Sequence, residues 1–301
     1  MKTVLLSMIV AAALGAALPA ASIAAPAQPH QAQATQQPLP PGVRAIRNVA
    51  YGPGALERFD VYLPLLPVND APVIFMVHGG AWRFGDKSAR GVVQNKVAHW
   101  VPRGVIVISV DYPMLPDTPP LQQARDLGMA LAAAQRDATQ WGGDPHKFVL
   151  MGHSAGAHLV ALISAEPSLA TSQGALPWLG TVALDSAAYN VATIMQSRHL
   201  GLYDRAFGSD PAAWAAVSPI AQLQTGIAPF LAVCSSRRAD SCGQAQAFAA
   251  KARGLGTRVQ VLPEDLSHEE INATLGEPSS YTTAVDRFLA SLDPALATRL
   301  R

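Results

Sequence analysis

A serine between two glycines is the strongest chemical signal in this sequence. Ser154 stands in the pentapeptide Gly-His-Ser-Ala-Gly at positions 152–156, after the apolar run 148–151 and before an Ala- and Leu-rich stretch. This context is typical of a strand that turns sharply into a helix and lifts a hydroxyl above the edge of a sheet. Glycines beside the serine let the backbone approach itself closely. We therefore expect Ser154 to be a nucleophile; an ordinary tight turn is the alternative.

Backbone N–H groups suited to a developing negative charge occur at two places. Ala155 would begin the helix after the serine, and Gly79 and Gly80 follow the apolar run 72–77 within His-Gly-Gly-Ala-Trp at positions 78–82. We expect the N–H groups of Gly79, Gly80 and Ala155 to form an oxyanion hole. An ordinary glycine turn is the alternative for the upstream motif. We expect His78 to be structural and Trp82 to line the substrate pocket.

A serine nucleophile needs a histidine base. His268 follows the last expected strand on the loop 264–268, at a place where a loop can reach back to the serine. His153 and His158 flank the serine and are expected to point away from it, although His153 is also a candidate for contact with substrate. We therefore predict His268 as the base; an exposed loop histidine is the alternative.

The base in turn needs an acid that orients it. Asp240 is the one carboxylate in the loop 235–242, after the strand that precedes the histidine, and it gives the chain order serine, acid, histidine. Glu264 and Asp265 are weaker candidates because they are close in sequence to the histidine. Asp185 is weaker still, with loop capping as its other role. We predict Asp240 as the acid.

Strands and helices alternate along most of the chain. Apolar runs predict buried strands at 72–77 and 105–112, and the run 148–151 predicts the strand that leads to the serine. Further strands are expected at 180–185, 230–234 and 258–263, and the alternating segment 57–64 predicts an outer, half-exposed strand. Helical spacing of apolar residues occurs at 119–141, 245–255 and 281–292. The pattern predicts an α/β fold with a mainly parallel sheet covered on both faces.

Residues 186–226 interrupt this alternation with aromatic residues and helix-start signals. Chain that follows a parallel strand lies on the ligand-binding side of the sheet. We expect this insert to wall the substrate pocket; a surface excursion is the alternative.

The N-terminal residues carry the features of a secretory signal. Residues 1–25 combine Lys2, an apolar run and small residues, which predicts a signal peptide, and a retained membrane anchor is the alternative. Residues 26–41 are rich in Gln, Pro and Ala and are expected to be a flexible linker before one domain at 42–301. We expect a periplasmic or secreted protein with no stable membrane insertion after cleavage. The formal net charge of +1, without a basic run, gives no reason to expect nucleic acid as a partner.

The chain has two cysteines, Cys234 and Cys242. In an oxidising compartment we expect them to form a disulfide across a small loop; two free thiols are the alternative. No Cys/His cluster has the spacing of a metal site, so we expect neither a metal nor another cofactor.

The motifs at positions 78–82 and 152–158, taken together, resemble the α/β-hydrolase fold. They resemble more narrowly the branch that holds hormone-sensitive-lipase-like carboxylesterases, feruloyl-esterase-like enzymes and arylformamidases. The resemblance runs from about residue 45 to the C-terminus. It implies Ser154 as nucleophile, His268 as base, and Gly79, Gly80 and Ala155 as oxyanion donors.

The sequence departs from this family in two places. Many relatives have a Gly-x-x-Asp turn after the strand before the histidine, whereas residues 235–240 here are longer and rich in arginine. The larger N-terminal cap of the family is short or absent, which argues against long-chain lipase activity.

These observations predict a serine carboxylesterase that cleaves small or aromatic esters through an acyl-enzyme. An arylformamidase that resembles kynurenine formamidase is the enzymatic alternative. A non-catalytic binding protein of the same fold is the alternative from another class.

Overall fold

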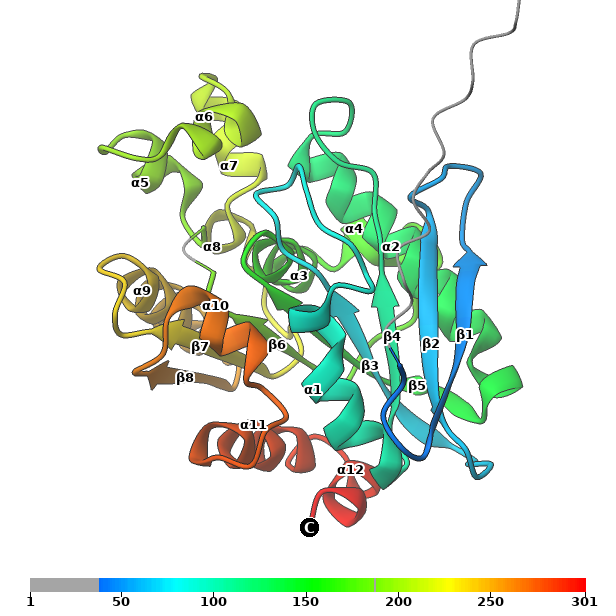
Figure 1. Ribbon diagram of the computed structural model, residues 1–301. Helices are drawn as coiled ribbons and strands as arrows, with labels where there is room; N and C mark the ends of the chain where they lie inside the picture. The colour runs from blue at the N-terminus through cyan, green and yellow to red at the C-terminus, as the bar shows by residue number, and fades with distance from the viewer. Residues whose placement is uncertain (1–37, 187) are drawn as a thin grey trace, which may run out of the picture. The chain divides into compact units, whose positions relative to one another are not determined.

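An eight-stranded sheet forms the centre of the protein (Figure 1). The structure is a computed structural model, and it describes residues 38–186 and 188–301. The strands are β1 Val43–Ala50, β2 Arg58–Pro64, β3 Ala71–Val77, β4 Ile106–Val110, β5 Gly143–His153, β6 Gly180–Leu184, β7 Phe230–Ser235 and β8 Val259–Glu264. The α-helices are α1 Arg90–Trp100, α2 Pro120–Asp137, α3 Ala155–Ala165, α4 Ser168–Thr171, α5 Val191–Met195, α6 Gly201–Phe207, α7 Pro211–Ala216, α8 Pro219–Gln222, α9 Ser241–Gly254, α10 His268–Ala273, α11 Ser280–Ala290 and α12 Pro294–Arg299, with 3₁₀ turns at Val101–Arg103 and Ala138–Trp141.

The sheet is mainly parallel, as the sequence predicts. Its strand order is β1-β2-β4-β3-β5-β6-β7-β8. The pairs from β4 to β8 are parallel, while β1 pairs with β2, and β2 with β4, in antiparallel directions. Because β5 and β6 are parallel neighbours in register, His153 lies opposite Leu184, and the residues that follow both strands emerge side by side.

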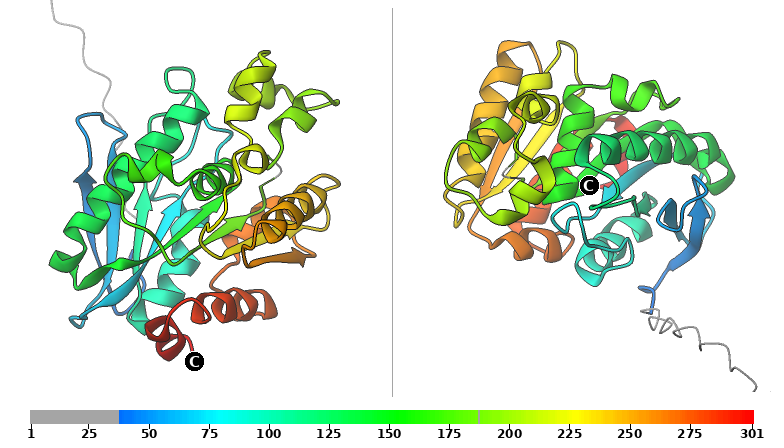
Figure 2. Two further views of the ribbon diagram at one scale, coloured as in Figure 1. Left: turned by 180° about the vertical axis from the view of Figure 1, so that it is seen from behind. Right: turned by 90° about the horizontal axis from the view of Figure 1, so that it is seen from above.

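Alternate side chains of the central strands pack on opposite faces of the sheet. In β3, Ile74 and Met76 join a core that includes side chains from α1, α11 and α12. Val73, Phe75 and Val77 join a core with side chains from α2 and α3 on the other face. The helices on the α2 and α3 side are seen when the molecule is turned to its back (Figure 2). Burial of these strands on both faces explains their continuous apolar sequences.

The expected strands and the three long helices predicted between 119 and 292 are present. The edge strand β1 was not predicted. It covers one side of β2, which is buried along most of its length, so the expectation of an outer, half-exposed β2 was wrong. The short helices α10 and α12 were also not predicted, because six residues are too few to show a helical period.

The insert between β6 and β7 contains the short helices α5 to α8. In Figure 1, α5, α6 and α7 lie together at the top left, and the view from above shows them at one end of the molecule (Figure 2). They lie on the side where the chain leaves β6, which agrees with the expected place of this segment.

The predicted signal peptide, 1–25, and most of the predicted linker, 26–41, lie outside the described residues. Within 38–186 and 188–301, no helix combines the length and the apolar character that crossing a bilayer requires.

Candidate active site

Ser154 occupies a sharp turn between β5 and α3. Its φ of 56° and ψ of −117° are in a sparsely populated region for a residue with a side chain. A Cβ on Gly152 would come within 2.4 Å of the Gly156 carbonyl oxygen, and one on Gly156 within 2.4 Å of the His78 carbonyl oxygen. Both glycines are therefore required by close backbone contacts. The expected strand, turn and helix around the serine are confirmed.

His268 is brought to the serine by the first turn of α10. Its Nε2 atom lies 2.9 Å from the Ser154 Oγ atom. Ser267 caps this helix together with Glu270 in a reciprocal pair of side-chain to backbone hydrogen bonds, which fixes the place where the histidine enters the helix. The structure thus pairs the predicted base with the predicted nucleophile.

Asp185, and not Asp240, is the carboxylate beside His268. Its Oδ2 atom lies 2.5 Å from His268 Nδ1, and its side chain is fully buried. Asp185 directly follows β6, so the register of β5 and β6 places it next to Ser154, whose N–H donates to the Leu184 carbonyl oxygen.

The geometry contradicts the prediction of Asp240 as the orienting acid. Asp240 is the N-cap of α9, its side chain is 57% exposed, and it lies 3.8 Å from Arg238 Nη2. The loop after β7 instead supplies hydrogen-bond donors to the carboxylate of Asp185.

These donors surround both oxygens of Asp185. The N–H of Ser235 donates to Oδ1 over 2.7 Å, the hydroxyl of Ser241 donates to the same oxygen, and Arg238 Nη1 donates to Oδ2 over 2.6 Å. Burial alone would raise the pKa of Asp185, but the hydrogen bonds from His268, Ser241, Ser235 and Arg238 outweigh it and lower the pKa well below its ordinary value. The carboxylate is therefore ionised at neutral pH.

The tautomer of His268 follows from its two neighbours. Nδ1 must carry the hydrogen because its partner is the ionised Asp185, so Nε2 can accept the hydrogen of the serine hydroxyl. Arg238 Nη1 is also 2.9 Å from Nδ1, but with both atoms bearing hydrogen the arginine donates to the carboxylate instead.

The glycine pair lies against the nucleophile. A Cβ on Gly79 would be 2.8 Å from the Ser154 Cβ, so a side chain at this position would displace the serine. Gly80 has a φ of +121°, which favours glycine, and its carbonyl oxygen accepts hydrogen bonds from two N–H groups later in the same loop. Ala155 is the first residue of α3, and the first N–H groups of a helix have no partner within it. Of the predicted oxyanion donors, Gly79 and Ala155 are thus close to the serine.

Trp82 lines the pocket and ties three segments together. Its Nε1 donates to His158 Nδ1 over 3.1 Å, and His158 Nε2 donates to the Val217 carbonyl oxygen over 2.8 Å. Burial lowers the pKa of His158 to about 4, so its ring is neutral at physiological pH and can accept the tryptophan hydrogen. The second histidine of the motif therefore anchors the upstream loop and the insert to α3.

His153 packs against the base instead of entering the pocket. It is buried, its ring centroid is 4.5 Å from that of His268, and its Nε2 donates to the His268 carbonyl oxygen over 2.9 Å. Burial, together with the nearby His268, lowers the pKa of His153 to about 3. The prediction that His153 contacts substrate is not supported by this position.

A pocket of about 260 Å³ opens above the serine. Ser154, Asp185 and His268 are among its lining residues, and Leu200, Leu202 and Tyr203 come from the insert, as expected. Trp82, Ala81, Ala155, Ser186, Ala188 and Arg238 complete the lining. Sequence reasoning gave Arg238 no role, because an arginine in a loop carries no pattern that distinguishes it from a surface charge.

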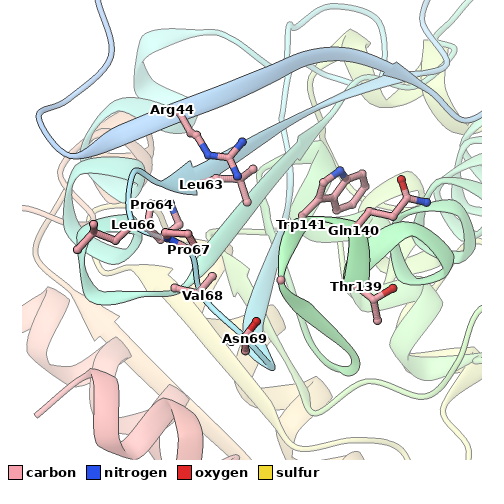
Figure 3. Close-up of a pocket in the computed structure, with 11 residues that line it drawn as sticks. Arg44, Leu63, Pro64, Leu66, Pro67, Val68, Asn69, Thr139, Gln140 and Trp141 are labelled. Carbon is pink, nitrogen blue, oxygen red and sulfur yellow. The ribbon is translucent and has the colours of Figure 1, made fainter.

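Another pocket lies at the opposite end of β5 (Figure 3). Its lining comes from β1 through Arg44, from the end of β2, from the segment before β3, and from the turn before β5, which includes Gln140 and Trp141. Since Ser154 follows the last residue of β5, an eleven-residue strand separates this pocket from the serine. Within 38–186 and 188–301, His, Cys, Asp and Glu side chains form no group of three or more able to hold a metal ion.

Solved structures show the fold. Esterase B from Lactobacillus rhamnosis superposes with a TM-score of 0.69 at 18% identity, over 87% of this chain and 89% of that one. The protein therefore has the α/β-hydrolase fold that the motifs predict.

Curated relatives share part of the sequence. A probable isoprenylcysteine α-carbonyl methylesterase of Oryza sativa is 31% identical over 54% of this chain and 40% of its own length. Esterase LipQ of Mycobacterium tuberculosis is 30% identical over 69% of this chain and 53% of its own length. Kynurenine formamidase of Salmo salar is 32% identical over 40% of this chain and 38% of its own length. The chain thus spans about half, or less, of the length of these relatives.

The model of one family matches residues 59–240, more than half of the chain. The matched range contains both glycine motifs, the nucleophile and Asp185, and it ends before His268. The chain belongs to the BD-FAE family.

Proposed function

We propose that the protein is a serine hydrolase that cleaves small carboxylic esters through an acyl-enzyme intermediate. The observation that supports this most directly is the connected set Ser154, His268 and Asp185, with contacts of 2.9 and 2.5 Å. Esterases among the relatives and structural neighbours agree with the proposal.

In the first half-reaction the Ser154 oxygen attacks the ester carbonyl while His268 Nε2 takes the hydroxyl proton. The buried, ionised Asp185 stabilises the imidazolium through Nδ1–H. The N–H groups of Ala155 and the Gly79–Gly80 turn bind the oxyanion. The tetrahedral intermediate collapses, His268 gives its proton to the leaving alcohol oxygen, and the acyl group stays on the serine.

In the second half-reaction a water molecule replaces the alcohol. His268 takes a proton from this water as it attacks the acyl carbonyl, and the collapse of the second intermediate returns that proton to the Ser154 oxygen. The products are the acid and the regenerated enzyme. The pocket of about 260 Å³ favours a short acyl or alcohol group over a long chain.

Turnover of p-nitrophenyl acetate, butyrate and octanoate tests this proposal. We expect hydrolysis of the two short esters and its loss in Ser154→Ala, together with loss of labelling by a fluorophosphonate probe. Ser186→Ala is the matched control, because this serine lines the same pocket and its hydroxyl instead accepts a hydrogen bond from the Ala188 N–H. No turnover and no labelling of the wild-type protein would favour a non-catalytic binding protein.

A formamide substrate is the second candidate, because one relative is a kynurenine formamidase. The same serine, base and acid can cleave a formamide, with the amine as the leaving group. N-formylkynurenine assayed beside the short esters separates the two, since a higher kcat/KM for the formamide would reassign the substrate class.

We also propose that the protein acts outside the cytoplasm, in the periplasm or after secretion. The disulfide between Cys234 and Cys242 supports this, because such bonds persist in oxidising compartments. The mass of the mature protein and its presence in a periplasmic or culture fraction test the proposal. Recovery of the uncleaved chain from the cytoplasm would contradict it.

A further inference from the structure

Arg238 stands between the catalytic pocket and a second cavity. The second cavity has a volume of about 380 Å³ and is formed by the insert and the start of α9. Leu200, Tyr203 and Arg238 line both cavities, so together they form the shared wall. A substrate that passes this wall can hold its ester at Ser154 and place another group in the second cavity.

The guanidinium group of Arg238 is held in place on one side. Nη1 donates to Asp185 Oδ2 over 2.6 Å and lies 3.3 Å from the Asp185 carbonyl oxygen. Because Nη1 is already bound, the Arg238 side chain is partly immobilised and loses little further entropy when Nη2 binds a ligand. The side chain is 27% exposed, so part of it faces the cavities.

The guanidinium group has two further polar neighbours, Tyr203 and Asp240, and its contact with Asp240 is weak. Nη2 is 3.8 Å from the nearest oxygen of Asp240, which is beyond hydrogen-bond distance, and Asp240 is 57% exposed. An exposed ion pair of this kind contributes little free energy. A ligand oxygen in the cavity can therefore compete with Asp240 for Nη2.

The remaining lining of the second cavity mixes apolar side chains, such as Ile194, with charged and polar ones. Arg198 and His199 line it beside Arg238, and Asp240 is the one carboxylate that does so among the described residues. The ring of His199 is 2.9 Å from Asp204, which lies outside this lining. Thr193, Ser197 and Gln244 add hydrogen-bonding groups. The two arginines of this lining can bind a small anion.

We propose that Arg238 is a specificity-determining residue that binds a carboxylate of the substrate, so the preferred substrates are esters that carry a carboxylate a few bonds from the scissile carbonyl. This inference rests on the proposed function. It assigns the second cavity to the charged part of the substrate, whether this belongs to the acyl or to the alcohol group. Arg238 is one imidazole ring away from the serine, which suits a short spacer such as two methylenes.

Two pairs of nearly isosteric esters test the proposal. The first pair compares monoethyl succinate, which carries a carboxylate on its acyl group, with the neutral ethyl levulinate. The second pair compares acetoxyacetate, which carries the carboxylate on its alcohol group, with the neutral acetoxyacetone. We expect kcat/KM to favour the charged ester in one pair by roughly tenfold, the size of a charge-assisted hydrogen bond that is partly exposed. Product acid and alcohol are quantified directly by chromatography.

Arg238→Gln distinguishes substrate binding from support of Asp185. Loss of a donor to Asp185 slows both members of a pair in parallel, whereas loss of carboxylate binding removes the preference between them. We expect the ratio of kcat/KM for the charged ester to that for the neutral ester to fall to about one in Arg238→Gln. We expect it to be partly retained in Arg238→Lys, which keeps the positive charge but not the planar pair of N–H donors. Asp240→Asn removes the competing carboxylate and is expected to raise the ratio.

Equal turnover within both pairs, or a preference that Arg238→Gln leaves unchanged, would overturn the proposal. Calorimetric titration of Ser154→Ala with the same four compounds measures binding without any reaction. Tighter binding of a charged ester that requires Arg238 supports the carboxylate site even if the esterase proposal fails. Turnover of neutral esters without such binding would instead leave the esterase in place and reject the site.

Discussion

At the level of single residues, Asp185 is the most strongly supported side chain of the site. Its two oxygens receive hydrogen bonds from a backbone N–H, a hydroxyl, a guanidinium group and the imidazole of His268. Each of these bonds favours the ionised carboxylate, which must face the imidazolium when the base has taken a proton. The carboxylate that we propose to orient the base is thus itself fixed by its neighbours.

This assignment predicts a contrast between two aspartates. We expect Asp185→Asn to lower kcat by roughly 10³- to 10⁴-fold, because an amide stabilises the wrong tautomer of His268 and carries no charge. Asp240→Asn makes the same chemical change in the neighbouring loop and is expected to keep kcat for a neutral ester near the wild-type value. The kcat for p-nitrophenyl butyrate measures both. Loss of activity in Asp240→Asn, with Asp185→Asn still active, would restore the acid that the sequence favoured.

A second residue-level prediction concerns His153. We expect His153→Ala to lower kcat by roughly fivefold to tenfold, because one hydrogen bond to the His268 carbonyl oxygen and the ring contact are lost. KM is expected to change little, because His153 packs behind the base. His146→Ala is the control, since this exposed histidine lies near the other end of β5. A raised KM with unchanged kcat would instead indicate that His153 contacts the substrate.

The serine and the histidine that the structure brings together could be predicted from the sequence, but the carboxylate beside the histidine could not. Ser154 has a local motif, and His268 was the histidine that followed the last strand. Both β6 and β7 end at the same edge of the sheet, so a carboxylate after either strand could reach the histidine. Asp185 follows β6 without a spacer, whereas Asp240 is five residues beyond Ser235, and this difference was the signal that sequence reasoning did not use.

At the level of elements, the loop between β7 and α9 holds the acid in place. The disulfide between Cys234 and Cys242 closes this loop. Ser235, Arg238 and Ser241, which all donate to Asp185, lie inside the closed segment. The bridge was predicted correctly from the number and spacing of the cysteines. The role of the bridge in holding the donors to Asp185 could not be predicted, because it depends on which strand the carboxylate follows.

Removal of the disulfide should therefore affect both stability and catalysis. We expect Cys234→Ala/Cys242→Ala to lower the free energy of unfolding by about 2–3 kcal/mol, the entropic value for a short loop. We also expect kcat to fall under conditions where the variant is still folded, because the three donors are less well fixed. Urea unfolding and kcat for p-nitrophenyl butyrate measure the two effects, and wild-type protein with a reductant is the parallel sample. A stability loss with unchanged kcat would limit the bridge to a structural role.

The base depends on a contact between two helices. Side chains of α1 reach the last carbonyl groups of α10: Asn95 donates to Ala273 and Lys96 donates to Asn272. His268 is the first residue of this short helix, so α1 helps to fix the base from the far end of α10. No local sequence pattern reveals this contact, because it joins residues more than 170 positions apart.

At the level of the whole molecule, the sheet separates two apolar cores, and the residues of the candidate site follow its strands at one edge. The fold could be predicted because continuous apolar runs reveal strands that are buried on both faces. The shape of the pocket could not be predicted, since short helices α5 to α8 are positioned by tertiary contacts such as the one between His158 and Val217. Substrate specificity accordingly has to be tested on the folded protein.

The stability of the whole molecule should depend on pH through Lys96. This side chain is fully buried with carbonyl and amide oxygens as partners, and burial lowers its pKa to about 7. In the unfolded chain the pKa of lysine is about 10.4, so between about pH 7 and 10 the unfolded state binds more protons than the folded state. The free energy of unfolding is therefore expected to rise with pH across this window, because the cost of burying the ammonium group disappears.

A comparison with Lys96→Met isolates this contribution. Methionine has a similar unbranched shape and does not titrate, so the pH dependence that is due to Lys96 is absent from the variant. We expect the stability of the wild type relative to Lys96→Met to increase by on the order of 2–3 kcal/mol between about pH 6 and 9.5. Urea unfolding at about pH 6, 8 and 9.5 measures it for both proteins. A constant difference across these pH values would mean that the three oxygens around Lys96 keep its ammonium group charged in the folded protein.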